Sequence, residues 1–328
     1  TARMMEQLVD AVSPSARLIL MGDPRQLTSI DAGSAFADIV GPVVDVDRDA
    51  GVVVLHKVHR FGGAIFDLAA AVLRGDVDRS VKLLLDGQAQ GLDSPVQWIE
   101  ADDVGPSPQV SDQVLAALVP HWVALVDAAE RGDESAAFAE LRNCRILCAH
   151  RDGRLGASFW NQLAFRSVAA VRAIGRDHGG WYPGRPLLIV ENDYQLTVFN
   201  GDTGVIMVSS ETGAAGSGSS VPDAGPVAVF DRAIGPLRIS PERLGPVQTA
   251  YASTVHKSQG SQFQQVLVVL PPPSSRVLSR ELLYTAITRA QRKVIVLASR
   301  ESLAAAIERR TVRSSGLQQR LWPSQSPS

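Results

Sequence analysis

The stretch LILMGDPRQLTSIDAG, residues 18–33, joins a short apolar run to a polar turn, and the expected fold follows from this junction. Residues 18–21 are apolar without alternation, which is typical of interior parallel strands because helices cover both of their faces. A glycine and a proline then end the run. In open α/β sheets ligands bind beyond the carboxyl ends of the strands, so Asp23, Arg25 and Gln26 are expected at a ligand site. An ordinary strand-to-loop turn is the alternative.

Strand-like and helix-like segments alternate along most of the chain. The expected strands lie at residues 18–21, 51–55, 96–100 and 145–150, and the expected helices at residues 33–40, 61–74, 110–129 and 155–174. This alternation predicts an α/β fold with a parallel sheet and helices on both of its faces. An uncapped helical pattern opens the sequence, and the first residue is Thr1, so the chain is expected to be part of a longer one.

The pattern changes between residues 183 and 246, where five short strand-like runs are separated by glycine, asparagine and proline. Helical periodicity is missing from this segment. Short strands at this density predict a small β-barrel, with residues 209–226 as a flexible excursion from it. The strand and helix alternation returns after residue 246, with the strand-like run KVIVLA near the end, so the barrel is expected to be an insertion in one α/β domain.

Composition excludes several classes of function. The 328 residues are 45% hydrophobic and 20% charged, and no apolar run approaches the length of a membrane span. The net charge of −2 argues against a uniformly basic DNA-coating protein, so any nucleic-acid contact is expected in a local groove. Cys144 and Cys148 are spaced to face one side of a strand as buried thiols, which suits a cytoplasmic protein rather than a zinc site.

Three further polar clusters lie beside apolar strands. HKVHRF, residues 56–61, places Arg60 between a strand and a helix, and STVHKSQGSQF, residues 253–263, connects two apolar strands. LLYTAITRAQRKVIV, residues 282–296, places Tyr284, Thr288 and Arg289 near the end of a helix that leads into a strand. A solvated turn and an arginine at the negative end of a helix dipole are the structural alternatives for the last two clusters. A polar loop between core strands nevertheless suits contact with a nucleotide or a polyanion.

The order of these motifs resembles that of superfamily 1 helicases over the whole chain. QLTSIDAGSAFADIV, residues 26–40, and FNGDTGVI, residues 199–206, are most similar to the RecD family, the alpha chain of exodeoxyribonuclease V. The resemblance implies RecA-like domains of the P-loop NTPase type and an inserted SH3-like β-barrel. The implied division is residues 1–45 for the end of the first RecA-like domain, 46–180 for the first part of the second, 181–246 for the barrel, 247–310 for the second part of that domain, and 311–328 for a flexible tail.

The resemblance also implies a nucleotide site and its residues. In such helicases the glutamine of the GDxxQ motif senses the terminal phosphate of ATP, so Gln26 takes that role and Asp23 supports it. Arg60 and Arg289 would reach the γ-phosphate, with Arg289 as the arginine finger, because guanidinium keeps its charge and offers forked donors. The implied catalytic residues are Gln26, Arg60 and Arg289, and the implied nucleotide-binding residues are Asp23, Gln26, Arg60, Gly260, Gln262 and Arg289.

A second set of residues matches the parts of the family that meet single-stranded DNA. The implied DNA-binding residues are Thr254, His256, Lys257 and Ser258 in the polar loop and Asn200 in the barrel.

The chain departs from the family pattern in two places. Relatives usually carry glutamate where this chain has Gln262, which can hydrogen-bond but has no charge. The sequence has no G-x-x-x-x-G-K-[ST] loop and no Asp-Glu pair that closes a buried strand. ATP and Mg²⁺ are therefore expected to be bound mainly by a preceding half of the protein. No metal ligands are predicted in this chain, and we expect that the chain alone does not hydrolyse ATP.

The resemblance implies the C-terminal part of an ATP-dependent DNA helicase that acts in DNA repair and recombination. Its implied polarity is 5′ to 3′, and its implied partners are single-stranded DNA and the beta and gamma chains of the exodeoxyribonuclease V complex. Two alternatives remain open at this point. One is a non-catalytic DNA-binding or assembly module with a helicase-like fold, and the other is a stand-alone RecD-like helicase.

Overall fold

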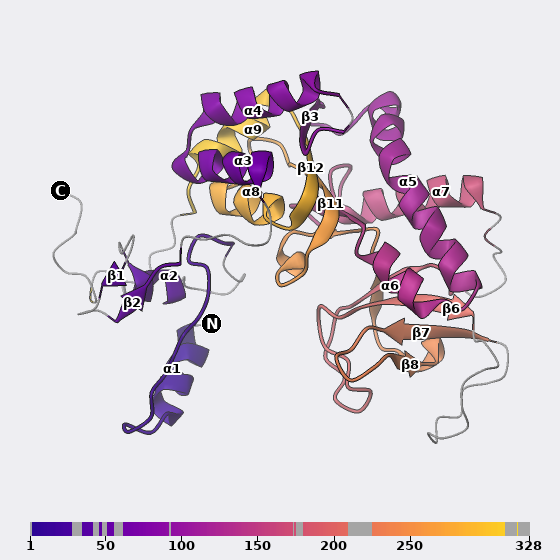
Figure 1. Cartoon of the computed structure of the whole chain (residues 1–328), viewed down its shortest axis with the longest axis horizontal. Helices are drawn as coiled ribbons and strands as arrows, with labels where there is room; N and C mark the ends of the chain where they lie inside the picture. Colours follow the sequence, from indigo (N-terminus) through magenta and orange to yellow (C-terminus); the bar gives the residue numbers. More distant parts are fainter. Residues whose placement is uncertain are drawn as a thin grey trace.

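The computed structural model describes residues 2–27, 35–41, 46–47, 51–55, 62–91, 93–172, 174, 180–208, 225–311 and 320. Figure 1 shows an α/β body built on one sheet, a second sheet below it, and an N-terminal part that extends away from the body. Arg60 and its motif lie outside the described residues. So do most of the expected excursion at 209–226 and nearly all of the expected tail at 311–328.

The body is built on five parallel strands. Their order is β10 (Ala252–Thr254), β4 (Cys144–Cys148), β11 (Phe263–Val269), β12 (Ala290–Ala298) and β3 (Val96–Glu100). Neighbouring strands pair in parallel throughout, for example Leu267 with Ile146 on one side and Ile295 on the other. The predicted parallel α/β sheet is therefore confirmed. Its central strands are apolar without alternation because both faces are covered.

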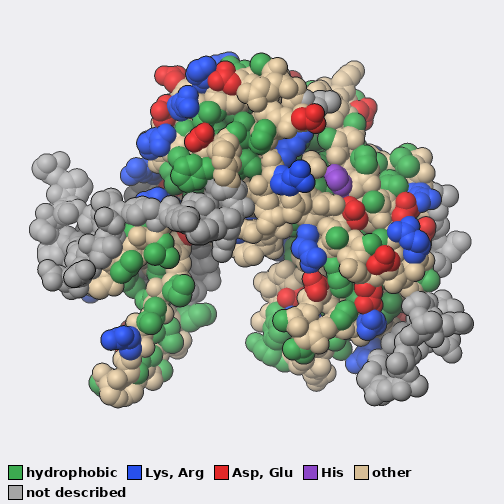
Figure 2. Space-filling model, viewed as in Figure 1, with side chains coloured by type: hydrophobic (Ala, Val, Ile, Leu, Met, Phe, Trp, Pro, Cys, Tyr) green, Lys and Arg blue, Asp and Glu red, His purple; other side chains and the backbone are tan. Residues whose placement is uncertain are grey.

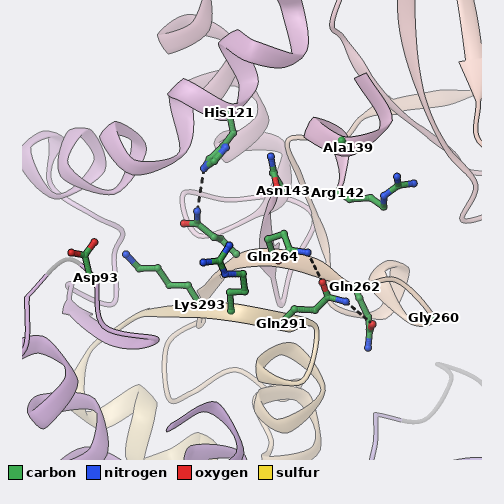
Figure 3. Close-up of a pocket in the computed structure, with 12 residues that line it drawn as sticks. Asp93, His121, Ala139, Arg142, Asn143, Gly260, Gln262, Gln264, Gln291 and Lys293 are labelled. Carbon is green, nitrogen blue, oxygen red and sulfur yellow. Dashed lines mark hydrogen bonds between the residues drawn. The ribbon is translucent and has the colours of Figure 1, made fainter. Parts of the chain in front are cut away.

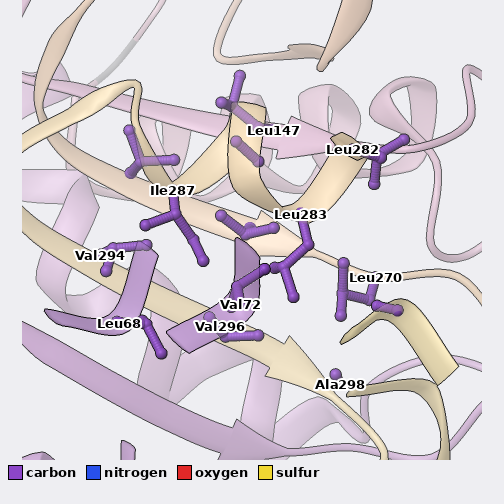
Figure 4. Close-up of a cluster of buried hydrophobic side chains, with 14 of the residues drawn as sticks. Leu68, Val72, Leu147, Leu270, Leu282, Leu283, Ile287, Val294, Val296 and Ala298 are labelled. Carbon is purple, nitrogen blue, oxygen red and sulfur yellow. The ribbon is translucent and has the colours of Figure 1, made fainter. Parts of the chain in front are cut away.

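Helices cover both faces of this sheet. One face is covered by α3 (Gly63–Arg74), α4 (Val77–Ala89), α8 (Arg280–Ile287) and α9 (Arg300–Glu308), and the other by α5 (Pro108–Glu130) and α7 (Ala157–Val171). Figure 4 shows the first core, where Leu68, Leu283 and Val296 meet from α3, α8 and β12. Cys144 and Cys148 both join the second core, as their spacing predicts, and both are free thiols. Helix α6 (Glu134–Leu141) packs against both α5 and the second sheet, in a third core.

The second sheet is antiparallel and interrupts the α/β body. Its order is β8 (Leu237–Ile239), β7 (Pro226–Phe230), β6 (Thr203–Val208), β5 (Pro186–Ile189) and β9 (Val247–Thr249). One of the five expected runs, LTVF at residues 196–199, does not form a strand and takes part only in a single bridge between Asp193 and Val198. Tyr182 lies just before β5 and Tyr251 just after β9, and their hydroxyls are 3.1 Å apart. This hydrogen bond joins the segment that enters the second sheet to the segment that leaves it.

The N-terminal part departs from the predictions. The expected strand at 18–21 is wrong, because these residues form no strand and Met21 is 86% exposed. An interior strand needs hydrogen-bonding neighbours, and no described strand pairs with this run. The expected buried strand at 51–55 is also wrong, since β2 (Val52–Val53) pairs only with β1 (Val46–Asp47) and Leu55 is exposed. Val53 is 64% exposed as well, and an isolated pair of strands this short is only marginally stable.

The remaining N-terminal elements are two helices, α1 (Ala2–Ala11) and α2 (Ala35–Val40). Hydrophobic side chains are prominent on the surface of α1 in Figure 2, and Met4, Leu8 and Val9 are its exposed apolar residues. Within the described residues, no helix combines the length and the apolar character needed to cross a bilayer.

Helix α4 lies so close to β3 that Gly87 has no room for a side chain. A methyl group at this position would overlap the carbonyl oxygen of Val96. We expect Gly87→Ala in the intact protein to lower the free energy of unfolding by about 1 to 3 kcal/mol, as overpacking does in tight cores. Gly245→Ala is the matched control, because nothing lies within 4 Å of its added methyl group. Urea unfolding measures both variants, and equal stabilities would contradict this packing.

Candidate functional site

The GDPRQL motif contacts the end of helix α8 through its backbone. The amide of Leu27 donates to Thr285 Oγ1 at 2.7 Å, and the carbonyl of Leu27 accepts from the side chain of Gln259. Leu27 is also buried in the core that α3 and α8 share. Three motifs far apart in the sequence therefore meet at one residue, and the GDPRQL turn is held beside the polar loop and helix α8.

The carboxamide of Gln26 lies between two groups of opposite charge. Its Nε2 donates to Asp23 Oδ2 at 3.0 Å, and its Oε1 accepts from Arg289 Nη2 at 2.9 Å. A carboxylate can only accept and a guanidinium can only donate, so the chemistry fixes which way the amide faces. The structure thus brings together Asp23, Gln26 and Arg289, which the sequence analysis placed in one site.

Arg289 is buried, with 2% of its surface exposed, and all three of its nitrogens have acceptors. Besides Gln26, Nε donates to the carbonyl of Thr285 at 3.2 Å and Nη1 to the carbonyl of Ser261 at 3.3 Å. Helix α8 ends at Ile287, so the α8–β12 junction supplies a rigid base for this side chain. Among the described contacts, Nη2 reaches the GDPRQL motif by way of the Gln26 side chain, whereas Nε and Nη1 donate to backbone carbonyls.

Tyr284 adds a further donor to this cluster. Its hydroxyl donates to Asp23 Oδ2 at 3.3 Å, while the other carboxylate oxygen accepts from the amide of Arg25 at 3.0 Å. Burial, and then the charge of Asp23, raise the pKa of Tyr284 to about 12. The phenol therefore stays protonated at neutral pH and acts as a donor that holds Asp23.

Gly260 and Gln262 lie at the rim of a cavity of about 940 Å³ at the amino end of the parallel sheet (Figure 3). Gln264 donates to Gln291 at 2.6 Å, and Gln291 donates to Gln262 at 3.1 Å. The next residue along the chain, Phe263, donates its amide to the carbonyl of Arg289 at 2.9 Å. The cavity thus begins beside Arg289, and its other lining residues include His121, Arg142 and Lys293.

The predicted DNA-binding loop leaves the opposite, carboxyl end of the sheet. Thr254 ends β10, and a short 3-10 helix follows at His256–Ser258. The Nζ of Lys257 donates to Gln248 Oε1 at 2.9 Å. Ser258 is buried and its hydroxyl donates to the carbonyl of Val255, so this serine stabilises the turn. The role of these residues in binding DNA stays a prediction.

Two predicted residues are not joined to this cluster. Asn200 is exposed in a turn of the second sheet, where its amide donates to Asn192 Oδ1 at 2.8 Å, and no described contact links it to the loop at 254–258. Arg60 lies outside the described residues.

Sequence reasoning singled out Tyr284 but missed Gln259 and Thr285. Thr285 lies one residue after Tyr284 in the same motif, which is the one local signal for its place in the site. Gln259 lies within the polar loop, but nothing in its sequence context indicates a contact with Leu27.

The Leu27–Thr285 hydrogen bond can be tested directly in the intact protein. Thr285→Val removes the acceptor for the Leu27 amide, and a buried donor without a partner costs about 1 to 3 kcal/mol. We expect faster hydrogen exchange at residues 22–27 in this variant and near-normal exchange in Thr285→Ser. Thr288→Val is the control, because its hydroxyl bonds only within the helix among the described contacts. Unchanged exchange in Thr285→Val would contradict the contact.

The raised pKa of Tyr284 predicts a dependence of stability on pH. Unfolded tyrosine titrates near pH 10, whereas the folded residue titrates near 12, so its contribution to stability is present below pH 10 and is lost between pH 10 and 12. Tyr284→Phe should lose less stability over that range, by up to about 1 kcal/mol given the partial exposure of the ring. Urea unfolding at pH 9 and 11 measures it, and parallel losses would contradict the shift.

Known proteins resemble the chain in its motifs and over its length. Residues 249–297 match the UvrD-like helicase C-terminal domain, and residues 1–89 match an AAA domain. The RecBCD enzyme subunit RecD of Mycobacterium tuberculosis is 44% identical over 97% of this chain and 51% of that protein. The subunit of the same name from Mycolicibacterium smegmatis is 40% identical over 98% of this chain and 52% of that protein.

Among solved structures, Bacteroides Pif1 bound to ssDNA is 12% identical, with a TM-score of 0.37 over 74% of this chain and 51% of that one. The chain spans about half the length of the curated relatives it matches. Over nearly all of its length the chain is therefore similar to a part of the RecD subunits.

Proposed function

We propose that the intact protein is an ATP-dependent DNA helicase of a RecBCD-type repair and recombination complex, with 5′ to 3′ polarity. The hydrogen bond between Gln26 and Arg289 is the observation that carries this proposal. It joins the GDPRQL motif to Arg289 in the stretch TAITRA, residues 285–290, and these are the two motifs assigned above to sensing and stabilising the terminal phosphate. The RecD relatives support the same assignment.

The side chains in this cluster fit a phosphate group. Arg289 supplies forked, permanently charged donors, and its guanidinium is held in place by the carbonyls of Thr285 and Ser261. ATP, when bound, supplies the phosphoryl group that is transferred to water. Gln26 and Arg289 would orient that group and stabilise the charge that spreads over its oxygens, while Asp23 holds the amide of Gln26 in position.

The described residues contain no group of three or more potential metal ligands, so we propose that Mg²⁺ is held mainly by another part of the protein. Gly260 and Gln262 would contact the nucleotide at the rim of the cavity, beside Arg289.

The finer architecture is part of the proposal. We assign the antiparallel sheet as an SH3-like barrel inserted into the second RecA-like domain, with the boundaries given in the sequence analysis. Thr254, His256, Lys257 and Ser258, together with Asn200, would line the groove for single-stranded DNA. The beta and gamma chains of the complex are the proposed partners, and the two buried free cysteines suit the reducing cytoplasm.

Arg289→Ala in the intact protein tests the site. An arginine finger contributes about 10³ to 10⁵ in rate, so we expect DNA-stimulated ATP turnover to fall by that factor while ATP binding is largely retained. Arg289→Lys should recover little, because it keeps the charge but loses the fork. Single-turnover hydrolysis measures the effect, and Arg79→Ala on the exposed face of α4 is the control.

The burial of Arg289 means that its removal also affects the fold, so a second variant is needed. Gln26→Ala removes the same contact from a more exposed side chain. We expect it to lower turnover with a small change in melting temperature. Near-normal DNA-stimulated turnover in folded Arg289→Ala and Gln26→Ala would favour a non-catalytic module instead.

A further inference from the structure

The loop after β4, residues 149–156, lies beside the predicted DNA-binding loop. Strands β4 and β10 are parallel neighbours, with Cys148 paired to Thr254 where both strands end. The amide of Val255 donates to the carbonyl of Cys148 at 2.9 Å, so the two loops leave the sheet from a shared point. Side chains from both loops are thereby presented at the same carboxyl edge.

Backbone hydrogen bonds make the 149–156 loop rigid. The amides of Ala157 and Ser158 at the start of α7 donate to the carbonyls of His150 and Arg151 at 3.0 and 2.8 Å. A methyl group on Gly156 would collide with the backbone of Asp152, which shows how tightly the loop folds back on itself. The position of Arg151 is therefore set by the backbone and does not depend on a partner for its side chain.

The other polar side chains of this loop have partners elsewhere. Asp152 accepts from the hydroxyl of Ser158 at 2.8 Å, and the ring of His150 lies 2.9 Å from Ser275 Oγ. The guanidinium of Arg154 stacks 5.7 Å from the centre of the Phe159 ring. Arg151 is exposed and, in the part of the chain that the structure describes, forms no ion pair with a carboxylate.

Arg151 and Lys257 therefore form a pair of cations for which the described residues provide no neutralising acid. The only polar partner described for Lys257 is the uncharged amide of Gln248. Burial, and then the charge of Arg151, lower the pKa of Lys257, so the two cations are close enough to repel each other. Like charges held together cost stability, and a bound anion relieves that cost.

We propose that Arg151 and Lys257 act together as a phosphate clamp on the backbone of single-stranded DNA, with Arg151 as a DNA-contacting residue outside the polar loop. This inference rests on the proposed function, since it takes the ligand of the clamp from it. A planar guanidinium and a flexible ammonium on neighbouring loops can bind one phosphate or two adjacent phosphates. The clamp recognises the backbone and carries no base specificity.

The salt dependence of binding tests the clamp in the intact protein, with an oligothymidylate as the probe. Each phosphate contact to a single strand contributes about 0.7 to the slope of log K against log salt concentration. We expect Arg151→Ala to lower the slope by about 0.7 and to weaken binding about fivefold at 0.1 M salt. Lys257→Ala should have a similar effect, and Arg151→Lys should keep the slope.

Arg79→Ala, which removes an exposed cation from α4, is the matched control and should leave the slope unchanged. Melting temperatures of all variants separate lost contacts from lost folding. If Lys257→Ala lowers the slope and Arg151→Ala behaves like Arg79→Ala, the clamp is wrong and the proposed groove stands. If the unaltered protein does not bind the oligonucleotide, or neither variant changes the slope, the proposed groove itself is overturned.

Discussion

The carboxamide of Gln26 is the contact on which the rest of the candidate site depends. Asp23 can only accept hydrogen bonds and Arg289 can only donate them, so both can be satisfied by one side chain that does both. Gln26 and Arg289 are 263 positions apart in the sequence. Any group that attracts Arg289 must compete with Gln26, and any movement of Gln26 is felt by Asp23. An anion bound by Arg289 would therefore also affect Gln26 and Asp23.

The parallel sheet determines where the two halves of the site lie. Gln262 and Arg289 precede β11 and β12, at the amino end of the sheet, whereas Thr254 ends β10 at the carboxyl end. Parallel strands require a connection that returns from one end to the other, and here residues 255–262 make that return. Gln259 is bonded to Leu27 midway along it. A displacement of Leu27 beside the proposed nucleotide site would thus be passed to the proposed DNA-binding loop through residues 255–262.

The sequence predicted the elements whose signal is local and failed where the signal is tertiary. Strands β4, β11 and β12 contain the apolar runs ILC, VLVV and VIVLA, and burial on both faces favours such runs. The run at 18–21 has the same composition, but it lacks the paired neighbours that would make it a strand.

The convergence of Asp23, Gln26 and Arg289 followed from the motif resemblance, which carries tertiary information. The contacts of Leu27 with Thr285 and Gln259 involve its backbone amide and carbonyl, which every residue type except proline offers, so no residue pattern reveals them.

A buried cation limits which part of the 250–263 segment can move. Arg145 on β4 donates to the carbonyl of Ala250, and its guanidinium lies 4.8 Å from the centre of the Phe263 ring. Burial lowers the pKa of Arg145 to about 10, which still leaves it charged at neutral pH. A buried charge is costly to separate from its partners, so both ends of the segment are fixed to the same strand. The polar motif lies between these two fixed ends and is itself held by the bond of Val255 to Cys148 and of Gln259 to Leu27.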